Sequence, residues 1–242
     1  MFSRGMTENR FAVVVLAAGQ GLRMKAQRNK VYLPLAGHAM LAWSLKSFST
    51  IAEVARIIVV VRPEERILAS RVIQSELPDV MVELVSGGDS RHESEYLALD
   101  YLASAIFENE IDYVLVHDGD RPCVEAPLVY RVIAAALKSR GAIPAIEIEG
   151  LHASDRLNIS SENKQYVLAQ TPQMFPARAL LQAHWRARAD SFVATDSSEC
   201  VEKYHEVEIR WVAGDIRNIK ITYPEDMLFA ESILNSGLHP LT

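Results

Sequence analysis

The stretch Phe11-Ala-Val-Val-Val-Leu-Ala-Ala-Gly-Gln-Gly-Leu-Arg-Met24 decides the fold of this chain. Its first six residues are apolar throughout, which is typical of a strand covered on both faces of a sheet. Glycines at positions 19 and 21 follow, and glycine lets the backbone turn sharply and present N–H groups to a phosphate. Arg23 and Lys30 supply the positive charge that a triphosphate needs. We therefore predict a phosphate-binding loop after the first strand.

This loop is neither of the two commonest phosphate motifs. Met24 stands where the dinucleotide-binding fingerprint has its third glycine, and no Gly-x-x-x-x-Gly-Lys-Ser/Thr occurs anywhere in the chain. Taken alone, Gly19-Gln-Gly21 is as typical of a simple turn out of a strand as of a phosphate site.

Apolar, β-branched runs alternate with amphipathic stretches through the first 146 residues. Further strands are predicted over Arg56–Val61, Val80–Val85, Tyr113–His117 and Ala142–Ile146. Helices are predicted between them over Ala39–Phe48, Glu64–Ser75, Ser90–Ile106 and Ala126–Lys138. This alternation predicts an α/β fold with a doubly wound, mostly parallel sheet.

The pattern breaks after Ile146. The segment at about 147–168 is polar and irregular, and we interpret it as a protruding arm or hairpin. Beyond it, helices are predicted over Ala177–Ala189, Ser197–Tyr204 and from Pro224 to about Asn235, and strands over Glu208–Val212 and Ile219–Thr222. Because no linker rich in Gly, Ser or Pro divides the chain, we expect a single domain over residues 1–242.

Composition and charge exclude several classes of protein. The 242 residues are 49% hydrophobic and 23% charged, which is ordinary for a globular chain and excludes collagen-like, coiled-coil and low-complexity proteins. A net charge of -6 argues against nucleic acid or an anionic membrane as the main partner. The two cysteines lack any zinc-motif spacing, and the early apolar run Phe11–Ala18 is far shorter than the roughly 20 residues that span a bilayer. We therefore expect a cytoplasmic protein.

Asp118 directly follows the predicted strand Tyr113–His117, so it should lie at the carboxyl end of a central strand, where open α/β sheets bind ligands. A carboxylate beside a triphosphate is a natural Mg²⁺ ligand. Asp120, two residues on, could add a second ligand, but we favour a solvated turn carboxylate, because turns favour Asp. We interpret His117 as a packed strand residue rather than a base.

Five ordered segments carry a resemblance to a known family. They are Leu16–Met24 with Lys30, Ser86-Gly-Gly-Asp-Ser-Arg-His-Glu-Ser94, Val116-His-Asp-Gly-Asp-Arg-Pro-Cys123, Ala169-Gln-Thr-Pro-Gln-Met-Phe175 and Asn218-Ile-Lys-Ile-Thr-Tyr-Pro-Glu-Asp226. In order and spacing they resemble the motifs of the 2-C-methyl-D-erythritol 4-phosphate cytidylyltransferase family over residues 11 to 231. The resemblance implies a Rossmann-like nucleotidyltransferase fold.

The resemblance also implies an activity. It is the transfer of the cytidylyl group from CTP to 2-C-methyl-D-erythritol 4-phosphate, with release of pyrophosphate and with Mg²⁺ as cofactor, in the non-mevalonate route to isoprenoid precursors. We expect a homodimer in which the arm crosses to the partner. Two alternatives stay open: another alditol phosphate, such as ribitol 5-phosphate, as the acceptor, or a nucleotide-binding relative with a decayed acceptor site.

The family's functional residues transfer to matching positions here. Arg23 and Lys30 would stabilise charge at the attacked α-phosphate, and Lys220, which we place on the strand Ile219–Thr222, would position the attacking phosphate. The nucleotide-binding residues would be Ala17, Ala18, Gly19, Gly21, Arg23, Met24, Gly88, Asp89, Arg91, Ser94 and Asp118. The acceptor-binding residues would be Asp118, Arg121, Thr195 and Lys220, and the metal ligand would be Asp118. Ser90 fits a helix cap instead.

The chain departs from the family pattern at several points. Gly119-Asp120 replaces the usual Ala-Ala, and Asn29-Lys30-Val31 replaces the usual Pro-Lys-Gln. In the arm, Asn163 stands where an Arg is usual, and no Asp-Thr pair occurs; Arg156 and Lys164 are the nearest arm cations. The nucleotide half of the resemblance is therefore stronger than the acceptor half.

Overall fold

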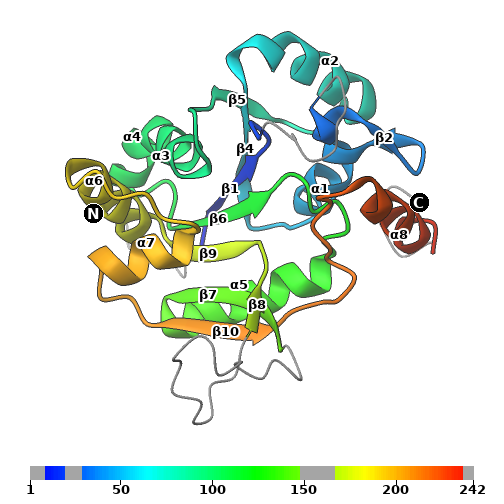
Figure 1. Cartoon of the computed structure of the whole chain (residues 1–242). Helices are drawn as coiled ribbons and strands as arrows, with labels where there is room; N and C mark the ends of the chain where they lie inside the picture. The colour runs from blue at the N-terminus through cyan, green and yellow to red at the C-terminus, as the bar shows by residue number, and fades with distance from the viewer. Residues whose placement is uncertain (1–8, 20–28, 148–166, 237–242) are drawn as a thin grey trace, which may run out of the picture.

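The structure is a computed structural model that describes residues 9–19, 29–147 and 167–236. A twisted central sheet carries helices on both faces (Figure 1). Its strands are β1 (Phe11–Leu16), β4 (Val54–Val61), β5 (Glu83–Ser86), β6 (Tyr113–Asp118), β7 (Gly141–Glu147), β8 (Val167–Ala169), β9 (Gln173–Pro176) and β10 (Ile209–Ala213). The helices are α1 (Met40–Ser49), α2 (Arg66–Glu76), α3 (Arg91–Tyr101), α4 (Ala103–Phe107), α5 (Ala126–Ser139), α6 (Ala177–Ala189), α7 (Ser197–Tyr204) and α8 (Pro224–Leu234).

The sheet runs β10-β7-β9-β6-β1-β4-β5, and β8 pairs with β7. Strand β1 lies at its centre and pairs in parallel with β4 on one side and β6 on the other. The pairs β4–β5 and β7–β10 are also parallel, whereas β9 runs antiparallel to β6 and β7. The predicted doubly wound, mostly parallel α/β fold is thereby confirmed.

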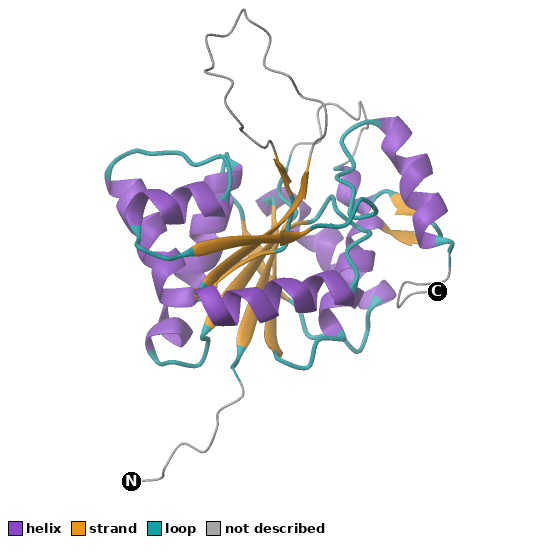
Figure 2. Cartoon of the chain, turned by 90° about the horizontal axis from the view of Figure 1, so that it is seen from below, coloured by secondary structure: helices purple, strands orange, loops and turns teal. Residues whose placement is uncertain are grey.

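The alternation of side chains along β1 divides the core between the two faces of the sheet. Val13 and Val15 pack against apolar residues of α1, α2 and α5. Ala12 and Val14 point the other way, toward α3, α4, α6 and α7. Because every one of these β1 residues is fully buried, the strand is covered on both faces, as its continuous apolar run predicts. Figure 2 shows the strands lying between the helical layers.

A third, smaller cluster anchors the end of the chain. It joins α8 to Trp43 of α1 and to Leu35 of a short hairpin, β2 (Pro34–Leu35) and β3 (His38–Ala39). Ile221 is fully buried in this cluster. Burial of Ile221 fixes the segment that carries Lys220.

The predicted strand over Ile219–Thr222 is wrong. The backbone N–H of Ile221 bonds to the carbonyl of Asp120, and the N–H of Thr222 bonds to the side chain of Asp226. These N–H groups bond to a turn and to a helix-capping carboxylate rather than to a neighbouring strand. Lys220 therefore lies on an irregular connection.

Other boundaries also differ from the sequence-based expectation. The helix predicted over Ser90–Ile106 is divided at Leu102 into α3 and α4, and the strand predicted over Val80–Val85 begins only at Glu83. Strand β9 was not predicted. At the base of the predicted arm, Glu147 pairs with Val167, so the two ends of that segment lie side by side; residues 148–166 lie outside the described residues. Among the described helices, none is both long and apolar enough to cross a membrane.

A buried contact between a carboxylate and an imidazole joins the helices α3 and α6. The side chain of Glu95 is 1% exposed, and its Oε1 lies 3.1 Å from His184 Nε2 while its Oε2 accepts a hydrogen bond of 2.9 Å from Arg91. Burial alone would raise the pKa of Glu95. The attraction of His184 and Arg91 and the hydrogen bond from His184 outweigh burial and lower that pKa to about 2.

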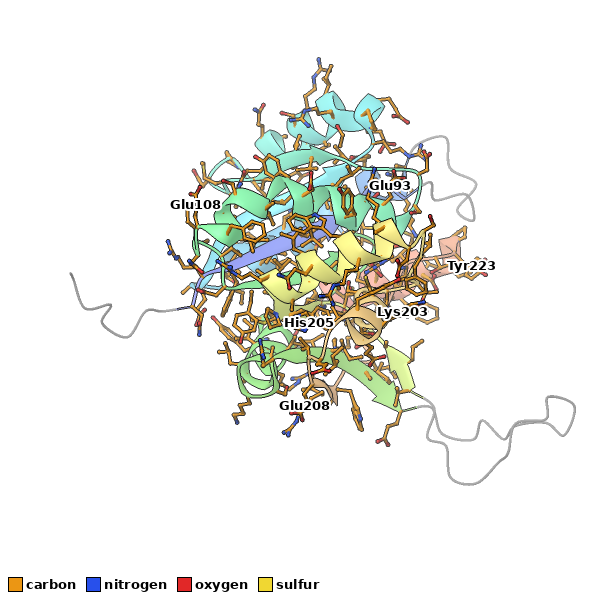
Figure 3. The ribbon with its side chains drawn as sticks, turned by 90° about the vertical axis from the view of Figure 1, so that its left-hand side faces the viewer. Glu93, Glu108, Lys203, His205, Glu208 and Tyr223 are labelled. Atoms are coloured by element: carbon orange, nitrogen blue, oxygen red, sulfur yellow. The ribbon has the colours of Figure 1, made fainter. Side chains whose placement is uncertain are left out.

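We predict that Glu95 makes stability dependent on pH in the acid range. Because its folded-state pKa is lowered, its contribution is present above the unfolded pKa of about 4.3 and is lost as pH falls toward about 2. Glu95→Gln should lower the free energy of unfolding at pH 7 by about 1.5–3 kcal/mol, with the deficit shrinking between pH 4.5 and 2. Urea unfolding at several pH values measures this. Glu108→Gln, at an exposed site (Figure 3), is the control; a deficit that does not change with pH would contradict the assignment.

Candidate active site

A cavity of about 590 Å³ opens at the carboxyl ends of the central strands. Leu16 ends β1, Asp118 ends β6, and Arg62 directly follows β4; all three border the cavity. The parallel strands explain this convergence, because their carboxyl ends meet at one edge of the sheet. Register places Asp118 directly opposite Leu16.

Most of the predicted site residues that the structure describes border this cavity. They are Ala18, Gly19, Gly88, Asp89, Arg91, Ser94, Asp118 and Lys220. Ala17, Lys30, Arg121 and Thr195 are not among the bordering residues. Gly21, Arg23 and Met24 lie outside the described residues. The cavity is also bordered by Arg62, Glu64 and Asp120, which the sequence-based site did not include. Arg62 could have been found, because it follows a predicted central strand at its carboxyl end.

The two flanks of the predicted phosphate loop are tied together. Asn29 donates a side-chain hydrogen bond of 2.8 Å to the carbonyl of Ala17, and it donates another of 2.9 Å to Glu65. Arg62 donates to the carbonyl of Ala18 at 3.2 Å. Asn29 is 5% exposed, so it is part of the scaffold that holds the start of the loop and the following Lys30 close to β1.

The segment between β5 and α3 requires glycine at its start. A Cβ atom on Gly87 would lie 2.6 Å from the Cβ of Ala18 and 2.9 Å from the Oγ of Ser94, which no side chain can tolerate. The Oγ of Ser94 accepts a hydrogen bond of 3.2 Å from the N–H of Gly88, so this hydroxyl is fixed beside the cavity. Ser90 caps α3 by accepting from the N–H of Glu93 at 3.0 Å, as predicted.

Asp118 is the most strongly paired carboxylate of the cavity. Its Oδ1 accepts a hydrogen bond of 3.1 Å from Arg91, its Oδ2 accepts one of 2.8 Å from Lys220, and Arg121 Nε lies 3.8 Å from Oδ2. Burial alone would raise the pKa of Asp118, but these three cations outweigh burial and hold that pKa far below its usual range. These cations therefore favour the ionised form of Asp118.

Asp120 is not a solvated turn carboxylate. Its side chain is only 14% exposed, and its Oδ2 lies 2.6 Å from the ammonium nitrogen of Lys30. Its Oδ1 lies 3.7 Å from Lys220 Nζ and has no hydrogen-bond partner among the described residues. The turn was expected, but the partner was not, because Lys30 and Asp120 are 90 residues apart in the sequence.

Arg121 and His117 form the floor beneath Asp118. Arg121 is 7% exposed and donates to the carbonyl of Asn218 at 2.9 Å. His117 Nε2 lies 3.1 Å from the carbonyl of Arg121, which can only accept, so Nε2 carries the proton and Nδ1 accepts from the hydroxyl of Thr171 at 3.2 Å. Burial lowers the pKa of His117 to about 4. A neutral, fully buried imidazole with both nitrogens paired fits the packed residue that we expected.

The contacts of Thr195 differ from those of the other predicted acceptor-binding residues. Its backbone N–H and its hydroxyl both bond to Glu199, at 2.6 and 2.8 Å, and its side chain is exposed. The neighbouring Asp196 caps α7 and accepts a hydrogen bond of 3.2 Å from Gln173 of β9. The structure thus brings Asp118, Arg121 and Lys220 together but does not place Thr195 on the cavity wall.

Hard oxygen ligands for a divalent cation exist in the cavity. The carboxylates of Asp118 and Asp120 both border it, and carboxylate oxygen is the donor type that Mg²⁺ prefers. The Oδ1 of Asp120, which has no hydrogen-bond partner among the described residues, adds a ligand oxygen. The residues therefore fit a divalent cation, although Asp118 must exchange a hydrogen bond from Lys220 or Arg91 to bind it.

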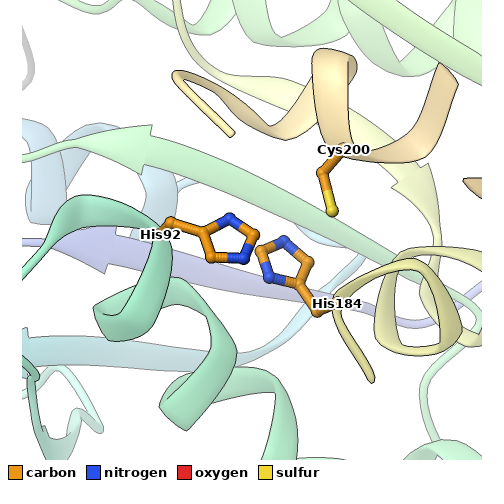
Figure 4. Close-up of side chains that lie close together, drawn as sticks. All are labelled: His92, His184 and Cys200. Atoms are coloured by element: carbon orange, nitrogen blue, oxygen red, sulfur yellow. The ribbon is translucent and has the colours of Figure 1, made fainter. Parts of the chain in front are cut away.

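A second group of metal-ligand types lies away from the cavity. His92, His184 and Cys200, from α3, α6 and α7, are buried with ligand atoms within 4.8 Å of one another (Figure 4). The two imidazole rings are stacked, with centroids 4.5 Å apart and planes 21° apart. Lone pairs of imidazole lie in the ring plane, so two stacked rings cannot aim at one ion. This arrangement is that of helix packing rather than of a metal centre.

Comparison with known proteins agrees with this site. Residues 11–236 match the protein family described as 2-C-methyl-D-erythritol 4-phosphate cytidylyltransferase. The enzyme of that name from Geobacillus kaustophilus is 34% identical over 235 residues, which cover 94% of this chain and 98% of the relative. The one from Shouchella clausii is 35% identical over 227 residues, covering 93% and 96%.

Solved structures agree with the sequence comparison. The crystal structure of 4-diphosphocytidyl-2C-methyl-D-erythritol synthase from Anaerococcus prevotii matches with a TM-score of 0.80 at 26% identity, covering 94% of this chain and 97% of that chain. The cytidylyltransferase structure from Thermus thermophilus matches with a TM-score of 0.68 at 27% identity, covering 93% and 99%. Because the match extends over nearly the whole chain and includes the strands that build the cavity, the chain belongs to the 2-C-methyl-D-erythritol 4-phosphate cytidylyltransferase family.

Proposed function

We propose that this protein transfers the cytidylyl group from CTP to 2-C-methyl-D-erythritol 4-phosphate and releases pyrophosphate. The observation that carries the proposal is the cavity itself, in which Arg91, Lys220 and the ionised Asp118 meet beside the glycine segment Gly87-Gly88. The three cationic side chains that border it among the described residues, Arg62, Arg91 and Lys220, suit phosphate-bearing substrates, and membership of the family supplies their identity. An oxygen of the acceptor phosphate attacks the α-phosphorus of CTP, and the bond from that phosphorus to the β-phosphate bridging oxygen breaks.

The chain's own residues position and stabilise charge in this step. The acceptor phosphate is already ionised, so no general base is needed, and positioning with electrostatic stabilisation is the main task of the protein. We assign Lys30 and Arg23 to the charge that develops at the α-phosphate, and Lys220 to the incoming acceptor phosphate. Arg121 lies beneath Asp118 and donates to the carbonyl of Asn218. It thereby supports the contact between Asp118 and Lys220.

Nucleotide recognition would take place at the carboxyl end of β5. The Ser94 hydroxyl is fixed beside the N–H of Gly88 and can bond to the edge of a pyrimidine. The lack of side chains at Gly87 and Gly88 allows a flat base to approach the backbone. Asp89 and Arg91 complete this wall.

The family generally uses a divalent cation, and we propose Mg²⁺ at Asp118. When bound, the ion supplies positive charge to the triphosphate. Two further expectations remain proposals: a homodimer, and an arm at about 147–168 that reaches the partner's acceptor site. The two ends of this segment are joined by strand pairing between Glu147 and Val167. This pairing is compatible with a protruding hairpin. Asn163, Arg156, Lys164 and most of that arm lie outside the described residues.

The acceptor is tested by pyrophosphate release across a panel of polyol phosphates. With CTP and Mg²⁺ present, we expect the highest kcat/KM with 2-C-methyl-D-erythritol 4-phosphate. Other nucleoside triphosphates serve as controls for the base. A clear preference for ribitol 5-phosphate would replace the proposed acceptor, and no turnover with any polyol phosphate would leave a nucleotide-binding relative.

Loss of Lys30 should affect chemistry more than binding. Lys30→Ala is expected to lower kcat by about 10²- to 10³-fold, as removal of one preorganised charge-stabilising donor does, while CTP still binds. Steady-state kinetics with a calorimetric measurement of CTP affinity separates the two effects. An unchanged kcat would remove Lys30 from the catalytic residues.

Loss of the Asp118 charge should alter the metal requirement. Asp118→Asn removes the ionised ligand while keeping the side-chain shape, so the Mg²⁺ concentration for half-maximal activity should rise by about tenfold or more. A Mg²⁺ titration at fixed CTP measures this. Asp112→Asn, at the opposite end of β6, is a matched control that should leave the titration unaltered; if Asp118→Asn also leaves it unaltered, Asp118 is not the ligand.

A further inference from the structure

We propose that Asp120, which stands where the family usually carries an alanine, is a positioning residue that couples the catalytic lysines Lys30 and Lys220. The inference deepens the proposed function and rests on it. Asp120 is the only carboxylate of the described residues that lies within 4.0 Å of both ammonium groups. It is therefore placed so that its single charge acts on both ammonium groups.

The Lys30 ammonium is fixed by two bonds. Its Nζ lies 2.6 Å from Asp120 Oδ2 and donates to the carbonyl of Ile221 at 2.5 Å. The carbonyl of Asp120 in turn accepts from the N–H of Ile221 at 2.8 Å. These three contacts join the first turn after the phosphate loop, the turn after β6 and the segment that carries Lys220. An ammonium has three N–H donors, so this arrangement leaves one for a phosphate oxygen.

Asp120 also continues an alternating line of charges. From Lys30 the line runs through Asp120 to Lys220 at 3.7 Å, and from Lys220 to Asp118 at 2.8 Å. Beyond Asp118 it continues through Arg91 at 3.1 Å. Lys220 lies between Asp120 and Asp118, and among the described carboxylates Lys30 pairs with Asp120 alone, so displacing Asp120 leaves the partly buried Lys30 charge without a counter-charge. Removing Asp120 would detach Lys30 from the rest of the line.

Gly119 lies close against the end of β1. The N–H of Gly119 bonds to the carbonyl of Leu16 at 2.9 Å, and a Cβ atom on Gly119 would lie only 3.0 Å from that carbonyl oxygen. The glycine thus lets the turn lie against the end of β1, while the next residue points its carboxylate toward Lys30. At Gly119-Asp120, which stands in place of the usual Ala-Ala, the aspartate supplies a counter-charge for Lys30.

The opposite expectation would be that Asp120 repels the triphosphate. A negative charge beside the phosphate site weakens the attraction of CTP, and an Asp120-free site would then bind CTP more tightly. The geometry favours positioning, because Lys30 is 8% exposed and has only Asp120 and Ile221 as described polar partners of its ammonium. Small displacements of a catalytic group cost as much as about 10²-fold in rate.

The test is a double-mutant cycle in kcat. Asp120→Ala, which restores the residue usual in the family, should lower kcat by about 10-fold or more while the KM for CTP changes by less than about 3-fold. Asp120→Asn keeps a hydrogen-bond acceptor for Lys30 and should lose less. In the Lys30→Ala background, Asp120→Ala should cause a smaller fold loss than in the wild type, because the part of its effect that acts through Lys30 is already lost.

Glu208→Ala is the matched control, since it removes a carboxylate paired with Arg210 at 2.8 Å at an exposed site (Figure 3) and should leave both constants unchanged. Fold losses that multiply in the double variant would overturn the inference, as would a lower KM for CTP with unchanged or higher kcat in Asp120→Ala. The same double-mutant cycle can be measured by melting temperature, which does not require an active enzyme. Strictly additive losses in melting temperature would show that the two side chains do not interact. Wild-type turnover separately decides the proposed function, so an active wild type with a failed cycle rejects only the role of Asp120.

Discussion

The ion pairing of Asp118 is the interaction on which the rest of the site depends. This carboxylate is 8% exposed at the end of β6, and Arg91, Arg121 and Lys220 surround it. A charge this deeply placed is tolerated only when it is paired, and removing a partner leaves an uncompensated charge. The three cations come from different parts of the chain. Their meeting at one carboxylate therefore requires the sheet, α3 and the C-terminal segment to be in place together.

This requirement explains why scaffold residues far from the cavity matter to it. Lys220 has no strand to hold it, and its position follows from the burial of Ile221 in the cluster that joins α8 to α1. Arg121 is held by the carbonyl of Asn218, and Asn218 donates to the carbonyl of Thr171 at 2.8 Å. The guanidinium of Arg91 also bonds to the carboxylate of Glu95, and that carboxylate contacts His184. The site is thus supported by one apolar cluster and by two sets of buried polar contacts.

The departures from the family pattern acquire different meanings in the structure. Gly119-Asp120 brings a counter-charge to Lys30, and Asn29 ties the base of the phosphate loop to Ala17. Both changes lie on the nucleotide side and come with contacts that account for them. Glu95 and His184 form a further buried pair that reaches the cavity only through Arg91. Residues 20–28, which include the predicted Gly21, Arg23 and Met24, lie outside the described residues.

The sequence by itself determined the elements whose signals are local. The continuous apolar run Phe11–Leu16 predicted a strand buried on both faces, Ser90 predicted a helix cap, and the position of Asp118 after a strand predicted its place at the sheet edge. Periodicity and capping involve neighbours within a few residues, so they can be read without a fold.

Only the tertiary structure decided how distant segments meet. The antiparallel insertion of β9 between β6 and β7, and the irregular path of the Lys220 segment, depend on which hydrogen-bond partners lie nearby after folding. The same holds for Asp120, which is an ordinary turn residue in the sequence and the partner of Lys30 in the fold. The ion pairs of a charged side chain depend on which opposite charges lie near it in the folded structure. No local sequence pattern indicates a contact between residues that are 90 positions apart.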